Sequence, residues 1–129
     1  MRDLDRAQRP LGNDLPMERF IAWQTRRDTS QASPPELTAE LQNLAGEAFN
    51  IVKRIDVITP RTTWGYQVVS AYRAAHETAR IGLEAVHDHR TLGTQSQSRA
   101  AEQRVMSALD ALREARTLRH TYEHQIATR

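Results

Sequence analysis

The most constraining feature of this sequence is a run of apolar residues between positions 37 and 58, separated by alternating steps of four and three. The run consists of Leu37, Leu41, Leu44, Ala48, Ile51, Ile55 and Ile58. This spacing puts the whole run on one face of an α-helix, as a seam that packs nearly parallel to another helix. Directly before it, Ser33-Pro34-Pro35-Glu36 is a capping box with proline in the first turn. A long helix is therefore predicted to begin there.

Two further long helices follow in the sequence. Thr59-Pro60 repeats the combination of cap and proline and leaves room only for a tight turn, so the next helix should be an antiparallel neighbour. It is expected to end near Gly93 in the left-handed conformation, and to bury Trp64, Val68, Ala71, Tyr72, Ala75, Ala79, Gly82, Leu83 and Val86. The hydroxyls of residues 94–98 can cap a last helix, whose predicted core face is Ala101, Val105, Ala108, Leu109, Leu112, Ala115, Leu118, Tyr122 and Ile126.

The N-terminal part is expected to be less regular. Residues 1–13 show no periodicity and end in turn-forming residues, so they are interpreted as an N-terminal arm. A short helix then follows, with Asp14 as its cap, and its apolar face is predicted to be Met17, Phe20 and Ile21 with Gln24. Strand signals and repeats are not found. The predicted fold is all-α: residues 14–129 form one up-down antiparallel helical bundle of three long helices plus a short N-terminal helix.

Composition narrows the classes of function. The chain has no cysteine, which excludes disulfides, thiolate metal sites and a cysteine nucleophile. It has no apolar run of the roughly 20 residues that span a membrane, so a cytoplasmic protein without a membrane partner is expected. The net charge is +2, which is low for a protein that coats nucleic acid. Lys53 is the only lysine among 18 basic residues, and the others are arginines. Either phosphate binding or a GC-rich genome explains this bias toward arginine.

Two motifs resemble metal sites. Glu84-x-x-His87 occurs once, whereas a di-iron carboxylate bundle needs two such inward-facing motifs and a glutamate from each of two other helices. His120-x-x-Glu123-His124 matches the pattern of inverted zinc metalloproteases but lacks an evident third ligand and a substrate cleft. No metal, cofactor or catalytic residue is therefore predicted.

A ribonuclease is the enzymatic alternative. Small helical nucleases of the HEPN family carry an arginine and a histidine with four to six residues between them, and three places in this chain have that spacing: Arg80 with His87, Arg113 with His120, and Arg119 with His124. A chain with this many arginines and five histidines produces about two such pairs by chance. The family's polar residue after the arginine and tyrosine after the histidine are missing at all three places.

The remaining polar pattern suggests a binding surface. On the helix predicted around residue 80, one stripe lies apart from the expected core face and should point outward. A second stripe lies on the last helix, and antiparallel pairing brings residue 73 level with about residue 113, so the two stripes could merge into a surface for a phosphate backbone. The candidate nucleic-acid contacts are Arg73, His76, Arg80, Arg113, Arg116 and His120.

An ordinary solvated surface is the competing interpretation of the same residues. Glu77, Glu84 and Glu123 stand three or four positions from these basic residues, and Glu114 lies between Arg113 and Arg116. Ion pairs at such spacings would neutralise the arginines and leave little charge for a ligand. A pure protein–protein adaptor without nucleic acid therefore remains possible.

The chain resembles the small helical subunit of CRISPR effector complexes in its format. The shared features are a short all-helical build, arginine-rich outer stripes and an N-terminal arm. The resemblance rests on the format of the whole chain. It implies a non-enzymatic bacterial protein that packs against other subunits, or copies of itself, and holds RNA or single-stranded DNA by its backbone. Leu4, Pro10 and Leu11 in the arm are the candidate anchors on a protein partner.

Overall fold

The structure, a computed structural model, describes residues 2–9 and 14–127. This part of the chain contains helices and no strands, as predicted. The helices are α1 (Arg2–Ala7), α2 (Pro16–Asp28), α3 (Pro34–Asp56), α4 (Thr63–Leu92) and α5 (Gln95–Ala127). Within the described residues, no helix has a stretch that is both long and apolar enough to cross a membrane.

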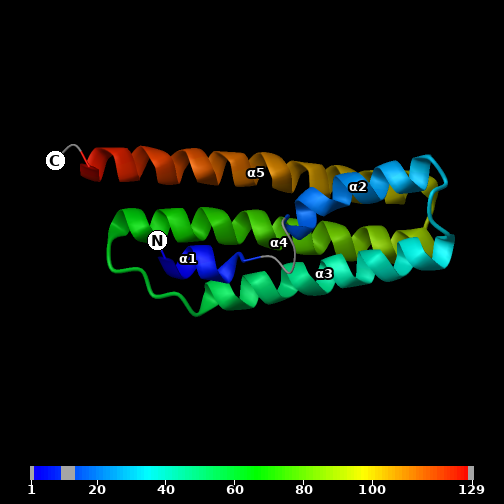
Figure 1. Ribbon diagram of the computed structural model, residues 1–129, viewed down its shortest axis with the longest axis horizontal. Coiled ribbons are helices and arrows are strands. Elements are labelled where there is room, and N and C mark those ends of the chain that lie inside the picture. The colour runs from blue at the N-terminus through cyan, green and yellow to red at the C-terminus, as the bar shows by residue number, and fades with distance from the viewer. Residues whose placement is uncertain (1, 10–13, 128–129) are drawn as a thin grey trace.

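The three long helices lie side by side, and each runs opposite to the one before it (Figure 1). α2 packs on α3 and α5, whereas α1 packs on α3 near the point where α3 ends (Figure 1). The register of α4 on α5 is set at Gly82, where an added Cβ would lie 2.7 Å from Val105 Cγ2 and 3.0 Å from the Val105 backbone nitrogen. This close approach agrees with the pairing expected from the short connection between the two helices.

The predicted core faces of the long helices are largely confirmed. On α3 the seam is buried from Leu37 to Ile55, and Ile58 just beyond the helix is partly buried. On α4 and α5 the expected residues are buried or half-buried with one exception, Ile126, whose exposed fraction is 46%. That residue lies near the end of α5, where the helix has few neighbours to pack against.

The helix ends agree with the sequence at some caps and differ at others. Ser33 caps α3 by accepting a hydrogen bond from the Glu36 backbone N–H, as predicted. α4, however, is capped by Thr62 and begins at Thr63, because the chain stays non-helical for several residues after α3 instead of turning directly at Thr59-Pro60. Gly93 has φ −106°, so the expected left-handed conformation is wrong. A reciprocal pair of hydrogen bonds between Thr94 and Gln97 then starts α5.

α2 packs against its own chain. Its cap is Leu15 and not Asp14, and the Glu18 carboxylate accepts the Leu15 backbone N–H at 3.0 Å. The predicted core residue Ile21 is exposed, whereas Trp23 is buried and its indole N–H donates to the Leu37 carbonyl at 2.9 Å. Burying the larger aromatic surface gains more free energy, so the helix turns Trp23 inward in place of Ile21.

The expectation of an irregular N-terminal arm is wrong where the chain forms helix α1. Two apolar residues, Leu4 and Ala7, are too few to give a periodic signal, yet both are buried. Asp5 accepts two hydrogen bonds from the Arg119 guanidinium, at 2.6 and 3.0 Å, which ties α1 to α5. Leu4 is therefore used within the chain and is not a free anchor for a partner. The other two candidate anchors, Pro10 and Leu11, lie outside the described residues.

Candidate nucleic-acid interface

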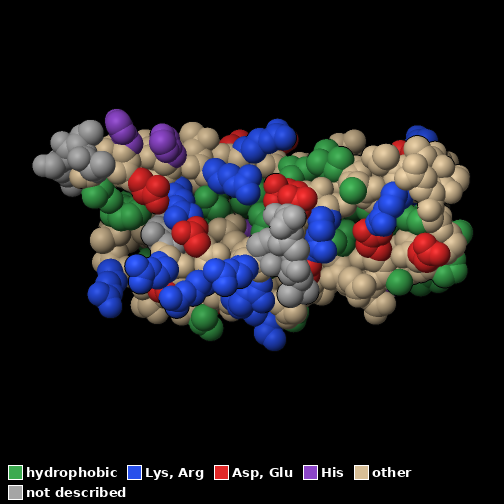
Figure 2. All heavy atoms as spheres, in the orientation of Figure 1, with side chains coloured by type: hydrophobic (Ala, Val, Ile, Leu, Met, Phe, Trp, Pro, Cys, Tyr) green, Lys and Arg blue, Asp and Glu red, His purple; other side chains and the backbone are tan. Residues whose placement is uncertain are grey.

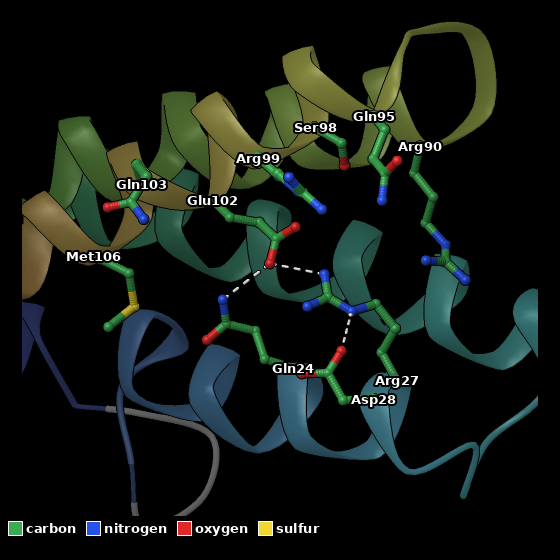
Figure 3. A pocket seen from close by; sticks show the side chains of 10 residues that line it. All are labelled: Gln24, Arg27, Asp28, Arg90, Gln95, Ser98, Arg99, Glu102, Gln103 and Met106. Atoms are coloured by element: carbon green, nitrogen blue, oxygen red, sulfur yellow. Dashed lines mark hydrogen bonds and ion pairs between the residues drawn. The ribbon is translucent and has the colours of Figure 1, made fainter.

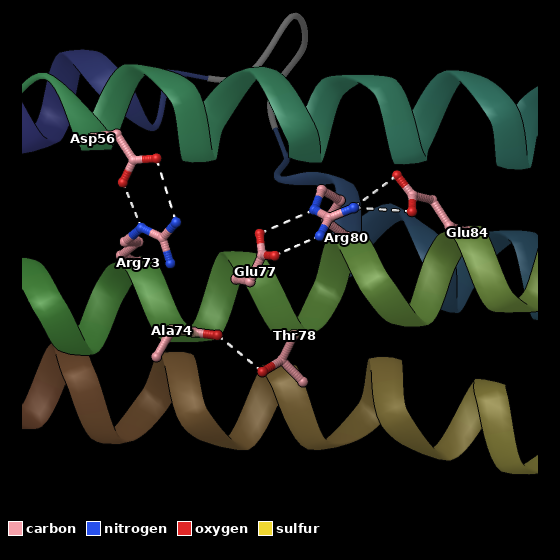
Figure 4. Close-up of polar contacts among 7 residues, drawn as sticks. All are labelled: Asp56, Arg73, Ala74, Glu77, Thr78, Arg80 and Glu84. Atoms are coloured by element: carbon pink, nitrogen blue, oxygen red, sulfur yellow. Dashed lines mark hydrogen bonds and ion pairs between the residues drawn. The ribbon is translucent and has the colours of Figure 1, made fainter.

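The two arginines predicted as contacts on α4 are engaged by carboxylates. Arg73 forms an ion pair with Asp56 of α3, and Arg80 binds both Glu77 and Glu84 on its own helix (Figure 4). The Arg73 hydrogen bond lowers the pKa of the Asp56 carboxyl, and the Arg80 hydrogen bond lowers that of Glu77. These carboxylates are ionised at neutral pH, so they offset the charge that the two arginines would offer to a phosphate.

The two predicted stripes do not form one surface. Arg73 and Arg80 lie on the α3 side of α4, whereas α5 runs along the other side (Figure 4). On α5, the Arg113 side chain is 74% exposed and lies 3.4 Å from Asp110, and Arg116 is also exposed. His120 is exposed as well, with its ring centroid 6.5 Å from that of His124.

His76 corrects the prediction most clearly, because it is 1% exposed and lies inside the protein. Its Nε2 is 2.7 Å from Gln8 Oε1, a residue that follows α1. Burial, with a smaller contribution from the charge of Arg116, lowers the pKa of His76 from 6.5 to about 4. The imidazole is therefore neutral at pH 7 and cannot contact a strand. The sequence did contain the signal, because Tyr72, His76, Ala79, Leu83 and Val86 continue an alternation of four and three.

The structure also shows how residues of the metal and ribonuclease motifs are placed. Among the described residues, no group of three histidine, aspartate or glutamate side chains could hold a metal ion. Glu123 accepts a hydrogen bond from Arg119 at 2.9 Å, and the same guanidinium binds Asp5. Hydrogen bonding to Asp5 raises the pKa of Arg119, which keeps it charged and held in place. Arg119, one of the arginines with the ribonuclease spacing, is thus committed to two carboxylates.

The structure brings together a different set of basic residues, here called the α1–α3 patch and defined as Arg2, Arg6, Arg54 and Arg61. These residues line two adjoining grooves beside α1, the larger with a volume of about 620 Å³. Arg54 is fixed in place because its Nε donates to the Ala7 carbonyl at 3.0 Å. Figure 2 shows lysine and arginine side chains gathered over α1 and the adjoining end of α3.

The charge of the α1–α3 patch is not neutralised. Asp3 is the only acidic residue among those described along the two grooves, and none of the four arginines has an ion pair within the described part of the chain. The nearby acids Asp5 and Asp56 are already bound to Arg119 and Arg73. Val57, 81% exposed, adds an apolar contact in the larger groove. The patch is therefore a concentrated positive surface.

Sequence reasoning missed this patch because its members come from three separate segments. Arg2 and Arg6 stand one helical turn apart in a segment expected to be irregular, while Arg54 and Arg61 lie on either side of the end of α3. A local signal was available: residues four apart share a face of a helix, and Leu4 with Ala7 would have supplied the buried side of that helix. Only the docking of α1 on α3 joins the two halves of the patch.

No protein-family model, no curated protein and no solved structure matches this chain. The chemistry of the patch is therefore the basis for inferring function. Guanidinium groups present several N–H donors in a planar fork that fits phosphate oxygens. The larger groove has no aromatic ring and no side-chain amide, the groups that commonly stack on bases or read their edges. The Trp64 ring at the smaller groove is half-buried and stacks on Tyr122. Such a surface suits a phosphate backbone better than a particular base sequence.

Proposed function

We propose that this protein is a non-enzymatic helical subunit, built as an up-down bundle, that holds the phosphate backbone of RNA or single-stranded DNA at the α1–α3 patch within a larger assembly. The observation that supports this most directly is the gathering, from α1, α3 and the following loop, of four arginines that have no ion pair among the described residues. The small helical subunit of CRISPR effector complexes, which the chain resembles in format, has a role of this kind.

The proposed affinity comes mainly from counterion release. Each phosphate neutralised on a single strand contributes about 0.7 to the slope of log affinity against log salt concentration. Four arginines that each meet one phosphate would give a slope near −3 on that basis. Because the groove offers little for base recognition, RNA and DNA strands of different sequence should bind with similar affinity.

The test is fluorescence anisotropy with short labelled single strands of RNA and DNA at about 50 and about 200 mM salt, the range in which phosphate contacts weaken measurably. The double variant Arg6→Gln/Arg61→Gln should reduce the salt slope by about 1.4, the contribution of two phosphates. The control Arg104→Gln/Arg113→Gln removes the same charge from exposed positions of α5 and should keep nearly the full slope.

Two outcomes would contradict the proposal. An equal loss of slope in both double variants would mean that net charge, and not the α1–α3 patch, determines binding. A labelled strand that shortens during the titration would support the ribonuclease in its place. Thermal melting followed by circular dichroism verifies that each variant keeps its helices.

A further inference from the structure

A second group of arginines surrounds a pocket at the opposite end of the molecule from α1. Arg27 comes from the last turn of α2, Arg90 from the last turn of α4 and Arg99 from the first turns of α5. The pocket has a volume of about 450 Å³, within the range of small-molecule sites. Figure 3 shows the Arg27 and Arg99 side chains directed toward the space between α2 and α5, with Gln95 and Ser98 nearby and Arg90 at the edge of the pocket.

Two of these cations lie against the ring of Trp23. The guanidinium carbon of Arg27 lies 5.0 Å from the centroid of the Trp23 ring, and that of Arg90 lies 5.6 Å from it. Phe20 stacks on the same ring. The ring itself is buried and anchored, which makes it a rigid support for two like charges. Like charges held together favour an anion between or beside them.

The acids of the pocket neutralise only part of this charge. Arg27 binds Glu102 at 2.7 Å and Asp28 at 2.9 Å, and Glu102 also accepts a hydrogen bond from Gln24 at 2.9 Å (Figure 3). Arg90 and Arg99 have no ion pair within the described residues. The pocket therefore has a fixed wall made by Arg27 and its carboxylates, and two arginines whose charge is available to a ligand.

We propose that this pocket binds the phosphate group of a small phosphomonoester, held by Arg90 and Arg99 with hydrogen bonds from Ser98 and Gln95. A planar carboxylate is satisfied by one arginine fork, whereas a tetrahedral phosphate accepts hydrogen bonds from several directions at once. The donors here come from two different helices, which fits the tetrahedral group. The volume leaves room for an attached organic group such as a nucleoside. This site is separate from the α1–α3 patch.

The experiment is isothermal titration calorimetry of the full chain with adenosine monophosphate, inorganic phosphate and adenosine. The first two ligands should bind saturably at one site and adenosine should not. Arg90→Gln and Arg99→Gln should each weaken the binding of adenosine monophosphate about tenfold or more, the usual cost of losing a charge-assisted hydrogen bond. The matched control Arg104→Gln changes another exposed arginine of α5 outside the pocket and should bind as the unmodified protein does.

Saturable binding of neither inorganic phosphate nor adenosine monophosphate would overturn the proposal. So would an equal loss in Arg104→Gln, or binding of adenosine as tight as that of its phosphate. The variant Arg6→Gln/Arg61→Gln should leave the calorimetric result unchanged, because its substitutions lie at the other end of the protein. Failure of this site is therefore distinguishable from failure of the proposed strand binding.

Discussion

Arg73 and Arg80, on the side of α4 that faces α3, look in the sequence like the arginines of the α1–α3 patch. In the structure the two groups differ in their carboxylate neighbours. Arg73 and Arg80 each have a carboxylate partner, and Arg80 has two. Arg6 and Arg61 line a groove with a single acid, Asp3. An arginine is available to a phosphate only where no nearby carboxylate already binds it. The distribution of acids, more than that of the arginines, therefore locates the candidate interface.

The patch also depends on a short helix that is weakly held. α1 carries Arg2 and Arg6, and it is docked by two buried apolar residues, by the Asp5–Arg119 ion pair and by the Gln8–His76 contact. The arginines of α4, in contrast, lie on a helix of 30 residues packed between two others. Any change that loosens α1 should remove the patch and leave the ion pairs of α4 in place.

The largest expected effect is the acid sensitivity that His76 confers. Its pKa is about 4 in the folded state and 6.5 as the ordinary value, so the unfolded chain binds more protons between these two pH values. The stabilising contribution is complete above pH 6.5 and is lost as the pH falls toward 4, a total of about 3 kcal/mol. Urea unfolding at pH 7 and pH 4.5 should show most of this loss.

His76→Gln supplies the matched test of that effect. Glutamine can still reach Gln8 but does not titrate, so the variant should lose less stability than the unmodified protein over the same pH interval. His120→Gln, at an exposed position on α5, is the control and should retain the full acid sensitivity. Acid sensitivity that is equally strong in His76→Gln would contradict the assigned role of His76.

The next effect concerns Gly82, where α4 approaches α5 most closely. A Cβ there would meet both a side chain and the backbone of Val105, so Gly82→Ala should reduce the free energy of unfolding by about 1–3 kcal/mol. Gly46 in α3 has nothing within 4 Å of an added Cβ, so Gly46→Ala should instead stabilise by about 0.5–1 kcal/mol. Urea unfolding measures both, and a Gly82→Ala variant as stable as the unmodified protein would show that α4 and α5 are not packed in this register.

A smaller effect should follow from releasing Arg80 of α4. Glu77→Gln/Glu84→Gln removes both of its partners and should raise the affinity for single-stranded RNA several-fold at low salt, because the released charge can meet a phosphate. Glu36→Gln/Glu114→Gln makes the same change in net charge at exposed positions that have no carboxylate–arginine pair within the described residues, and it should raise the affinity less. Equal gains in anisotropy titrations would mean that ion pairing does not control availability.

The sequence predicted much of the fold because its strongest signals are local. The seam from Leu37 to Ile55 and the cap at Ser33 depend on residues within one helix, and both are confirmed. α1 was missed because six residues with two apolar side chains give no period. Trp23 was absent from the predicted apolar face of the short helix, and in the structure its aromatic packing with Phe20 brings it into the core.

The candidate site was harder to predict because it depends on contacts between distant segments. The partner of Arg73, Asp56, is 17 positions away on another helix, and the partner of Asp5, Arg119, is 114 positions away. These two pairings decide which arginines are neutralised. The local pairs of Arg80 were predictable from their spacing of three and four, and the competing interpretation of a solvated surface did anticipate them.

The most direct test of the account compares two double variants with the same loss of charge. Arg6→Gln/Arg61→Gln removes patch arginines that have no ion pair within the described part of the chain, and Arg73→Gln/Arg80→Gln removes ion-paired arginines of α4. Anisotropy titration of both against single-stranded RNA at low salt should show a loss of about tenfold or more for the patch variant and less than about twofold for the α4 variant. A larger loss in the α4 variant would contradict the account.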